Sequence, residues 1–330
     1  MAHDITTPGS AAPLSRMSRG LLWAVLSAAS FGMSGALARP LLDAGWTPGA
    51  AVLVRVALAA VVVLPFGIRA LKGRWHLVTE NLLTIGLYGI LAVAAAQFCY
   101  FSAVQHMEVA PALLIEYTAP AAVVVWLWLR DGQRPSWITL AGAGVAALGL
   151  VLVLDLASGA SVSPVGVAWA LAAMVGCAAY FLISADEDNG LPPISLAAGG
   201  LTVGAVSLGA LGFAGLLPLH ATTVDTVYAG HAIAWWIPMG LLGLVTAALA
   251  YTMGIQASRL LGSRLASFVA LLEVVAAVVF AWVLLGELPG PMQFAGGLLI
   301  LLGVVGVKLG EPRTAEIEPL PIAGDLDAAA

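Results

Sequence analysis

The hydrophobic pattern of the chain is a series of apolar runs, separated by short segments rich in Pro, Gly and charged residues. Each run has about the 20 residues that a helix needs to cross a bilayer. Backbone groups in lipid must hydrogen-bond to one another, so we expect every run to be helical. The sequence therefore predicts an all-α integral membrane protein with ten transmembrane helices. They cover residues 20–39, 49–69, 82–104, 109–129, 136–154, 165–184, 194–216, 233–256, 263–285 and 290–308.

The chain also repeats itself with a shift of 154 residues, which the positions of its glycines and prolines reveal. Five helices per copy is an odd number, so the second copy enters the membrane in the opposite orientation. We therefore predict two inverted five-helix repeats, an arrangement typical of secondary transporters. A duplication that only enlarges the helix bundle is the alternative. The shift places Gly86, Gly89, Gly132, Pro135, Gly142 and Gly149 on Gly240, Gly243, Gly286, Pro289, Gly296 and Gly303.

This pattern divides the chain into a first repeat over 20–154, a linker over 155–164 and a second repeat over 165–308. The polar ends, 1–19 and 309–330, are predicted to be disordered cytoplasmic tails. An alternative takes the first apolar run as a secretory signal cleaved after Ala38. That alternative is disfavoured because cleavage would remove the first member of a repeat pair. We expect three pairs of glycines to form small faces that let helices approach closely: Gly86 with Gly89, Gly142 with Gly149, and Gly296 with Gly303.

Composition supports the membrane prediction and sets the orientation. Hydrophobic residues make up 61% of the chain and charged residues 9%, against about 25% charged in soluble domains. With the N-terminus inside, Arg39 alone faces outward and Arg55 lies within a helix, so the positive-inside rule predicts cytoplasmic termini in an inner or plasma membrane. The other basic residues fall on cytoplasmic segments: Arg16, Arg19, Arg69, Lys72, Arg74, Arg130, Arg134, Arg259, Arg264, Lys308 and Arg313.

The expected partners follow from the same composition. They are the lipid bilayer and a small-molecule substrate, while a homodimer stays open. No basic patch is present for nucleic acid. Cys99 and Cys177 lie in apolar stretches and are expected to pack there as small side chains rather than to form a disulfide or bind a metal. No cofactor is expected.

Two acidic residues fall within apolar runs, one in each repeat. Glu116 lies about 12 Å from the outer end of its predicted helix and Glu273 about 15 Å from the inner end of its own, at about 1.5 Å per residue. A charge at such depth costs at least about 2.5 kcal/mol. We expect these carboxylates to bind a coupling proton or a substrate ammonium group. A protonated, hydrogen-bonded structural role for each is the alternative.

Other polar and aromatic side chains at membrane depth complete the candidate site. Arg55 either extends to the outer surface or pairs with Glu116 and shares a substrate carboxylate. Gln97 and Tyr251 correspond under the repeat shift. We predict a central cavity lined by the first, third, fourth, sixth, eighth and ninth helices. Its remaining candidate residues are Trp23, Ser27, Tyr100, Tyr117 and Tyr180.

Motifs of other functional classes are missing from the apolar runs. They contain no aspartate pair for a metal-diphosphate, no zinc-protease His-Glu-x-x-His and no phosphate-binding loop. The protein is therefore predicted not to be an enzyme. A passive facilitator, a channel or a membrane sensor stays open beside an active transporter, because a pore and an alternating-access carrier share the same hydrophobic pattern.

The layout resembles the EamA-type transporters of the drug/metabolite transporter superfamily. The resemblance is carried by 114–120 (LIEYTAP) running to 132–134 (GQR), and by 272–274 (LEV) running to 286–288 (GEL), with Arg55 following Pro48. Val274 stands where the family usually has proline, and Gln133 where it has glutamate. The resemblance implies a ten-helix carrier that exports small metabolites, amino acids among them, from the bacterial cytoplasm. With the two carboxylates, this favours a proton-coupled exporter.

Overall fold

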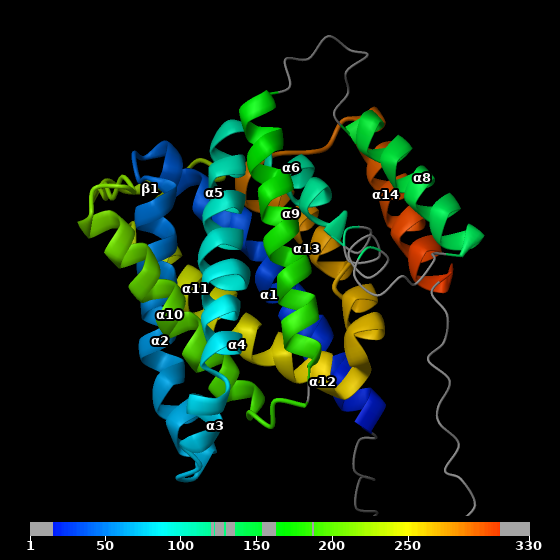
Figure 1. Cartoon of the computed structure of the whole chain (residues 1–330). Helices are drawn as coiled ribbons and strands as arrows, with labels where there is room; N and C mark the ends of the chain where they lie inside the picture. Colours follow the sequence, from blue (N-terminus) through cyan, green and yellow to red (C-terminus); the bar gives the residue numbers. More distant parts are fainter. Residues whose placement is uncertain are drawn as a thin grey trace, which may run out of the picture.

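The computed structural model describes residues 16–119, 122, 129, 136–153, 163–186 and 188–310, and in this part of the chain helices dominate (Figure 1). Six helices are long and apolar enough to cross a membrane, which supports the predicted membrane protein. These are α1 (Arg16–Asp43), α2 (Pro48–Leu71), Leu82–His106, α9 (Pro164–Ala185), α10 (Pro193–Phe213) and Trp236–Leu261. Shorter helices are α3 (His76–Glu80), α6 (Val109–Glu116), α8 (Trp137–Val153), α13 (Leu272–Leu285) and α14 (Pro291–Gly310).

Local chemistry fixes several helix ends close to their predicted positions. Thr47 caps α2 by accepting a hydrogen bond from the Ala50 amide, and Ser163 caps α9 in the same way. Pro48 and Pro164 follow these caps at the first helical position, where a missing amide proton costs nothing. Gly286 ends α13 in the left-handed conformation, with φ of 74°.

Two long helices contain a π-helical segment at corresponding places. Residues 82–106 comprise α4 (Leu82–Leu87), η1 (Tyr88–Ala95) and α5 (Ala96–His106), and the other composite helix comprises α11 (Trp236–Gly243), η2 (Leu244–Leu249) and α12 (Ala250–Val269). The shift of 154 carries η1 onto 242–249, which contains all of η2. Because π-helical turns are rare in proteins, their agreement supports the repeat independently of the glycine pattern.

The predicted boundary between the eighth and ninth helices is wrong. We placed a loop over 257–262, but α12 continues to Val269 and the chain breaks at Ala270 and Leu271 instead. Arg259 explains the difference, because its guanidinium donates to the backbone oxygen of Leu191 and to the side chain of Asn189. The loop that contains Asn189 and Leu191 thus binds the charge of Arg259, which was expected to lie in a loop between two helices.

The predicted fourth helix, 109–129, is also interrupted. Its first part, α6, ends at Glu116, and Tyr117 and Thr118 form a turn. Most of the continuation, with Pro120, lies outside the described residues, as do 132–134 and the tail from 311.

One β-hairpin departs from the all-α prediction. It consists of β1 (Thr226–Tyr228) and β2 (His231–Ile233), antiparallel, in the connection between α10 and α11. Ala229 and Gly230 between the strands both have positive φ, as a two-residue hairpin turn requires. The Tyr228 hydroxyl donates to the Leu37 carbonyl at 2.7 Å, which holds the hairpin against α1.

The last helices of the two predicted repeats, α8 and α14, pack side by side at one edge of the bundle (Figure 1). Glycines face each other across this contact, and a Cβ atom added to Gly149 would lie 2.6 Å from the carbonyl oxygen of Gly296. Gly303 likewise approaches the backbone of α8 at Gly142 and Ala146. The predicted close approach is therefore confirmed for α8 and α14. Of the other predicted pair, Gly89 approaches the Gly200 carbonyl, whereas an added Cβ atom at Gly86 meets nothing within 4 Å.

Candidate functional site

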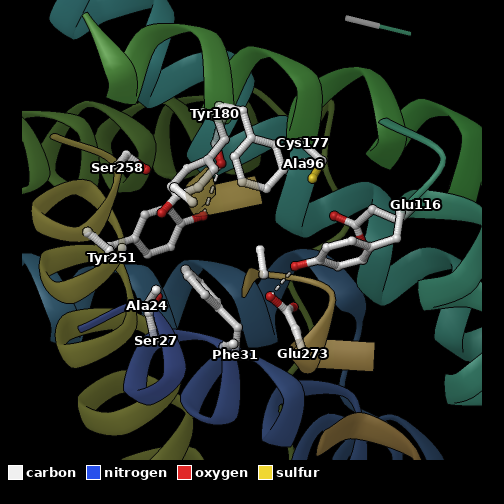
Figure 2. A pocket seen from close by; sticks show the side chains of 18 of the residues that line it. Ala24, Ser27, Phe31, Ala96, Glu116, Cys177, Tyr180, Tyr251, Ser258 and Glu273 are labelled. Carbon is white, nitrogen blue, oxygen red and sulfur yellow. Dashed lines mark hydrogen bonds between the residues drawn. The ribbon is translucent and has the colours of Figure 1, made fainter. Parts of the chain in front are cut away.

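A central cavity of about 60 Å³ lies between the helices. It is lined by α1, by η1 with α5, by the end of α6, by α9, by α12 and by the start of α13 (Figure 2). These are the segments predicted to line it. Among the described residues, no group of three His, Cys, Asp or Glu side chains could hold a metal ion.

Two carboxylates, Glu116 and Glu273, lie together at one end of the cavity (Figure 2). Glu116 is the last residue of α6, whereas Glu273 is the second residue of α13. The expectation that both would lie within continuous helices is thus wrong. Since 117 plus 154 is 271, the turn at Tyr117 corresponds to the break before α13. The two acids flank equivalent breaks, one preceding its break and the other following it.

The immediate partners of the two acids differ. The Tyr117 hydroxyl donates a hydrogen bond to Oε2 of Glu273. Among the described residues, none hydrogen-bonds to the Glu116 carboxylate, although only 7% of that residue is exposed. They are also the only charged side chains among the described residues that line the cavity. Two such carboxylates need a counter-charge, because a buried charge without one is costly.

The opposite end of the cavity is aromatic and carries hydroxyl groups. Phe31, Tyr180 and Tyr251 meet edge to face, with ring centroids separated by 5.0 to 6.2 Å. Figure 2 shows the hydroxyls of Tyr180 and Tyr251, and that of Ser258, at this end, away from the carboxylates. The cavity therefore presents an acidic end and a hydroxyl-bearing aromatic end, which suits a small molecule with a cationic group at one side.

Arg55 lies beside the cavity without lining it. Its guanidinium donates to Ser34 Oγ at 2.7 Å, to Gln97 Oε1 at 2.5 Å and to the Thr246 carbonyl at 2.5 Å. It also lies 5.3 Å from the centroid of the Phe101 ring, a cation–π contact. The residue is fully buried, so the alternative that it extends to the outer surface is wrong.

The other predicted residues divide into two groups. Gln97, Tyr117, Tyr180 and Tyr251 line the cavity, and Gln97 donates to the Tyr251 hydroxyl at 3.2 Å. Trp23 and Tyr100 are not among the lining residues. The structure places Tyr100 against the backbone of α1, where its hydroxyl approaches Gly35.

Sequence reasoning missed several lining residues, among them Phe31, Cys177, Gly254 and Ser258. Helical periodicity contains the signal for Phe31, because it follows Ser27 by four residues on one face of α1. Gly254 likewise follows Tyr251 by three residues in α12. An added Cβ atom there would overlap the Tyr180 hydroxyl and lie 2.8 Å from Ser27 Oγ, so the absence of a side chain makes room for both.

Comparison with known proteins agrees with this architecture. The family model described as the EamA-like transporter family matches twice, at residues 18–155 and 164–309. The chain is 28% identical to the threonine/homoserine exporter RhtA of Escherichia coli K12 over 301 residues, covering 89% of this chain and 91% of that protein. It is 29% identical to a probable terminal-alkyne amino-acid exporter of Streptantibioticus cattleyicolor, covering 79% and 83%. An uncharacterized inner membrane transporter of Salmonella typhimurium, YicL, is 21% identical over 90% of this chain and 97% of that protein.

A solved crystal structure shares the fold. It superposes with a TM-score of 0.60 at 19% identity, covering 89% of this chain and 98% of the solved one. The paired family matches and the membrane-length helices converge on a multi-pass membrane transporter rather than an enzyme. The chain belongs to the EamA-like transporter family.

Proposed function

We propose that this protein is a proton-coupled exporter of small amino-acid-like metabolites that works by alternating access. The observation that carries the proposal is the pair of carboxylates, Glu116 and Glu273, facing one central cavity from two equivalent helix breaks. Each comes from a different half of the chain. A movement of the halves relative to each other would therefore change the environment of both acids together.

The proposed topology is ten membrane spans in two inverted repeats, over 20–154 and 165–308, with both termini in the cytoplasm. The equivalent positions of η1 and η2, and the pairing of α8 with α14, support the two-fold relation. The bias of basic residues supports the orientation. The proposed location of the protein is the inner or plasma membrane of a bacterium.

Exchange of substrate against protons follows from the charge of the cavity. Two nearby carboxylates in a mostly apolar cavity are neutralised either by protons or by a bound cation. A substrate ammonium group that binds between Glu116 and Glu273 therefore competes with protons for the same oxygens. Such competition couples outward movement of the substrate to inward movement of protons.

The amino-acid class of substrate is supported by two features. Two of the relatives named above are an exporter of threonine and homoserine and a probable exporter of a terminal-alkyne amino acid. In this cavity, the hydroxyls of Tyr180 and Ser258 lie at the end away from the acids, where they would donate to a substrate carboxylate. Glu116 and Glu273 would then bind the ammonium group at the other end.

The test is transport into inside-out membrane vesicles. A panel of radiolabelled amino acids and related metabolites is offered with and without an imposed proton gradient. We expect at least one compound to accumulate only when the gradient is present. Glu116→Gln and Glu273→Gln should each reduce its accumulation about tenfold or more, because each removes a charge-assisted contact worth about 1.5–3 kcal/mol.

Glu80→Gln is the matched control, since Glu80 is exposed at the end of α3, and it should transport normally. Equilibration without any gradient dependence would contradict proton coupling and favour a passive facilitator or channel. Normal gradient-driven transport in both glutamine variants would contradict the assigned roles of the two acids.

A further inference from the structure

The amide that directly follows each π-helical segment departs from the α-helical pattern, and the two positions correspond under the repeat. In an α-helix, the Ala96 amide would bond to the Ala92 carbonyl, but here it donates to the carbonyls of Leu91 and Val93. The Ala250 amide would bond to Thr246, but it donates to Val245 and Ala247. Since 92 plus 154 is 246, the two carbonyls freed from their α-helical donors are equivalent.

Side chains from the opposite half of the chain bind both of these carbonyls. The Tyr251 hydroxyl, from the second half, donates to the Ala92 carbonyl of η1 at 3.0 Å. The Arg55 guanidinium, from the first half, donates to the Thr246 carbonyl of η2 at 2.5 Å. Each half thus supplies the donor that the π-helical segment of the other half requires.

Gln97 joins these two contacts into one chain of hydrogen bonds. Its Oε1 accepts from Arg55 at 2.5 Å and its Nε2 donates to the Tyr251 hydroxyl at 3.2 Å. Gln97 and Tyr251 are themselves equivalent under the shift of 154, so the contact between them joins equivalent positions of the two halves. Gln97 and Tyr251 also line the cavity, whereas Arg55 lies behind them.

We infer that Arg55, Gln97 and Tyr251 form a clasp that couples the two halves through their π-helical segments, with Arg55 as a positioning residue rather than a substrate ligand. The inference rests on the proposed carrier function. Full burial of Arg55 and its bonds to Ser34, Gln97 and the Thr246 carbonyl leave its charge bound within the protein. The clasp holds the cavity wall formed by Gln97 and Tyr251 and fixes how the halves move relative to each other.

The test uses the full-length protein in proteoliposomes, with Cys99→Ala so that Cys177 in the cavity is the single thiol. Arg55→Lys keeps the charge but loses the forked geometry that reaches several acceptors. Tyr251→Phe keeps the ring and removes only the hydroxyl, so it tests the clasp even where Arg55→Lys fails to insert. Thr252→Val is the matched control, because Thr252 donates only to the Ala248 carbonyl of the preceding helical turn.

Two readings are taken from each variant. Labelling of Cys177 by a small maleimide should be about tenfold faster in Arg55→Lys and Tyr251→Phe. Arg55→Lys loses a charge-assisted hydrogen bond, and Tyr251→Phe leaves the Ala92 carbonyl without its donor, and either loss shifts an equilibrium by about that factor. The double variant should be no faster than the faster single one, since both break the same chain of bonds. The maximal transport rate should fall about tenfold while KM stays within about twofold.

Two results would overturn the inference. One is a labelling result: either both single variants label within about twofold of the parent rate, or the rate increases of the two single variants multiply in the double variant. The other is a raised KM with an unchanged maximal rate in Arg55→Lys, which would make Arg55 a ligand of the substrate. Labelling of Cys177 needs no substrate. A parent protein that transports nothing would therefore contradict the carrier proposal alone. The clasp would still be tested by the labelling rates of the variants.

Discussion

At the scale of single residues, the cavity is defined as much by the absence of a side chain as by the charged groups in it. Gly254 lets the Tyr180 hydroxyl and Ser27 Oγ lie against the backbone of α12. Glycine in an apolar helix usually indicates close helix packing, and the sequence contains 37 glycines. Composition therefore gave no reason to separate Gly254 from the rest, whereas Glu116 and Glu273 were found because a carboxylate at membrane depth is rare.

Gly254→Ala should reduce substrate affinity. The added methyl group would overlap the Tyr180 hydroxyl, and Tyr180 is held between the rings of Phe31, Phe181 and Tyr251. In a cavity of about 60 Å³, the displaced hydroxyl would take space that the substrate needs. We expect KM to rise about tenfold, as one methylene does in a tight pocket.

The matched control for Gly254→Ala is Gly240→Ala in α11, where an added Cβ atom meets nothing within 4 Å. Initial transport rates over a range of substrate concentrations measure both variants. An unchanged KM in Gly254→Ala would show that this part of the cavity does not contact the substrate.

At the scale of helices, the hydrophobic pattern was informative about outer boundaries and poor at internal breaks. The observed ends of α2, α9 and α14 lie within two residues of prediction, since Pro, Gly and polar caps mark them in the sequence. The turn after Glu116 and the continuation of α12 to Val269 were not predicted. The continuation of α12 is accompanied by tertiary contacts of Arg259 with Leu191 and Asn189, which hydrophobicity along the chain does not encode.

The contact between α8 and α14 should depend on its glycines. Alanine at position 149 would place a Cβ atom 2.6 Å from both the Gly296 oxygen and the Ile300 nitrogen, which are backbone atoms. We expect Gly149→Ala to destabilise the protein by about 1–3 kcal/mol, the usual cost of overpacking. Thermal unfolding of the purified protein in detergent measures the effect.

Gly144→Ala in the same helix is the control for this prediction, because an added Cβ atom there meets nothing within 4 Å. It should be neutral or slightly stabilising, since alanine restricts the unfolded chain. Equal thermal stability of the Gly149→Ala and Gly144→Ala proteins would show that the glycine contact contributes nothing to folding.

At the scale of the whole molecule, the sequence revealed the repeat and the cavity-lining helices but not how the halves contact each other. The equivalence of Gln97 and Tyr251 was evident from the shift alone. Their direct hydrogen bond, and the capture of the Ala92 and Thr246 carbonyls, required the structure. The reason is that a π-helical segment differs from an α-helical one only in which carbonyl each amide bonds to, which residue types do not specify.

The measurement that bears most directly on the exchange site is proton release on substrate binding. The purified full-length protein, in weakly buffered detergent solution, is mixed with the amino acid that scores highest in the vesicle panel. If substrate ammonium and protons compete for Glu116 and Glu273, binding should release about one proton per carrier, and clearly fewer in Glu116→Gln or Glu273→Gln. Binding that releases no proton anywhere between about pH 5 and pH 8 would contradict the exchange of substrate for protons at these two carboxylates.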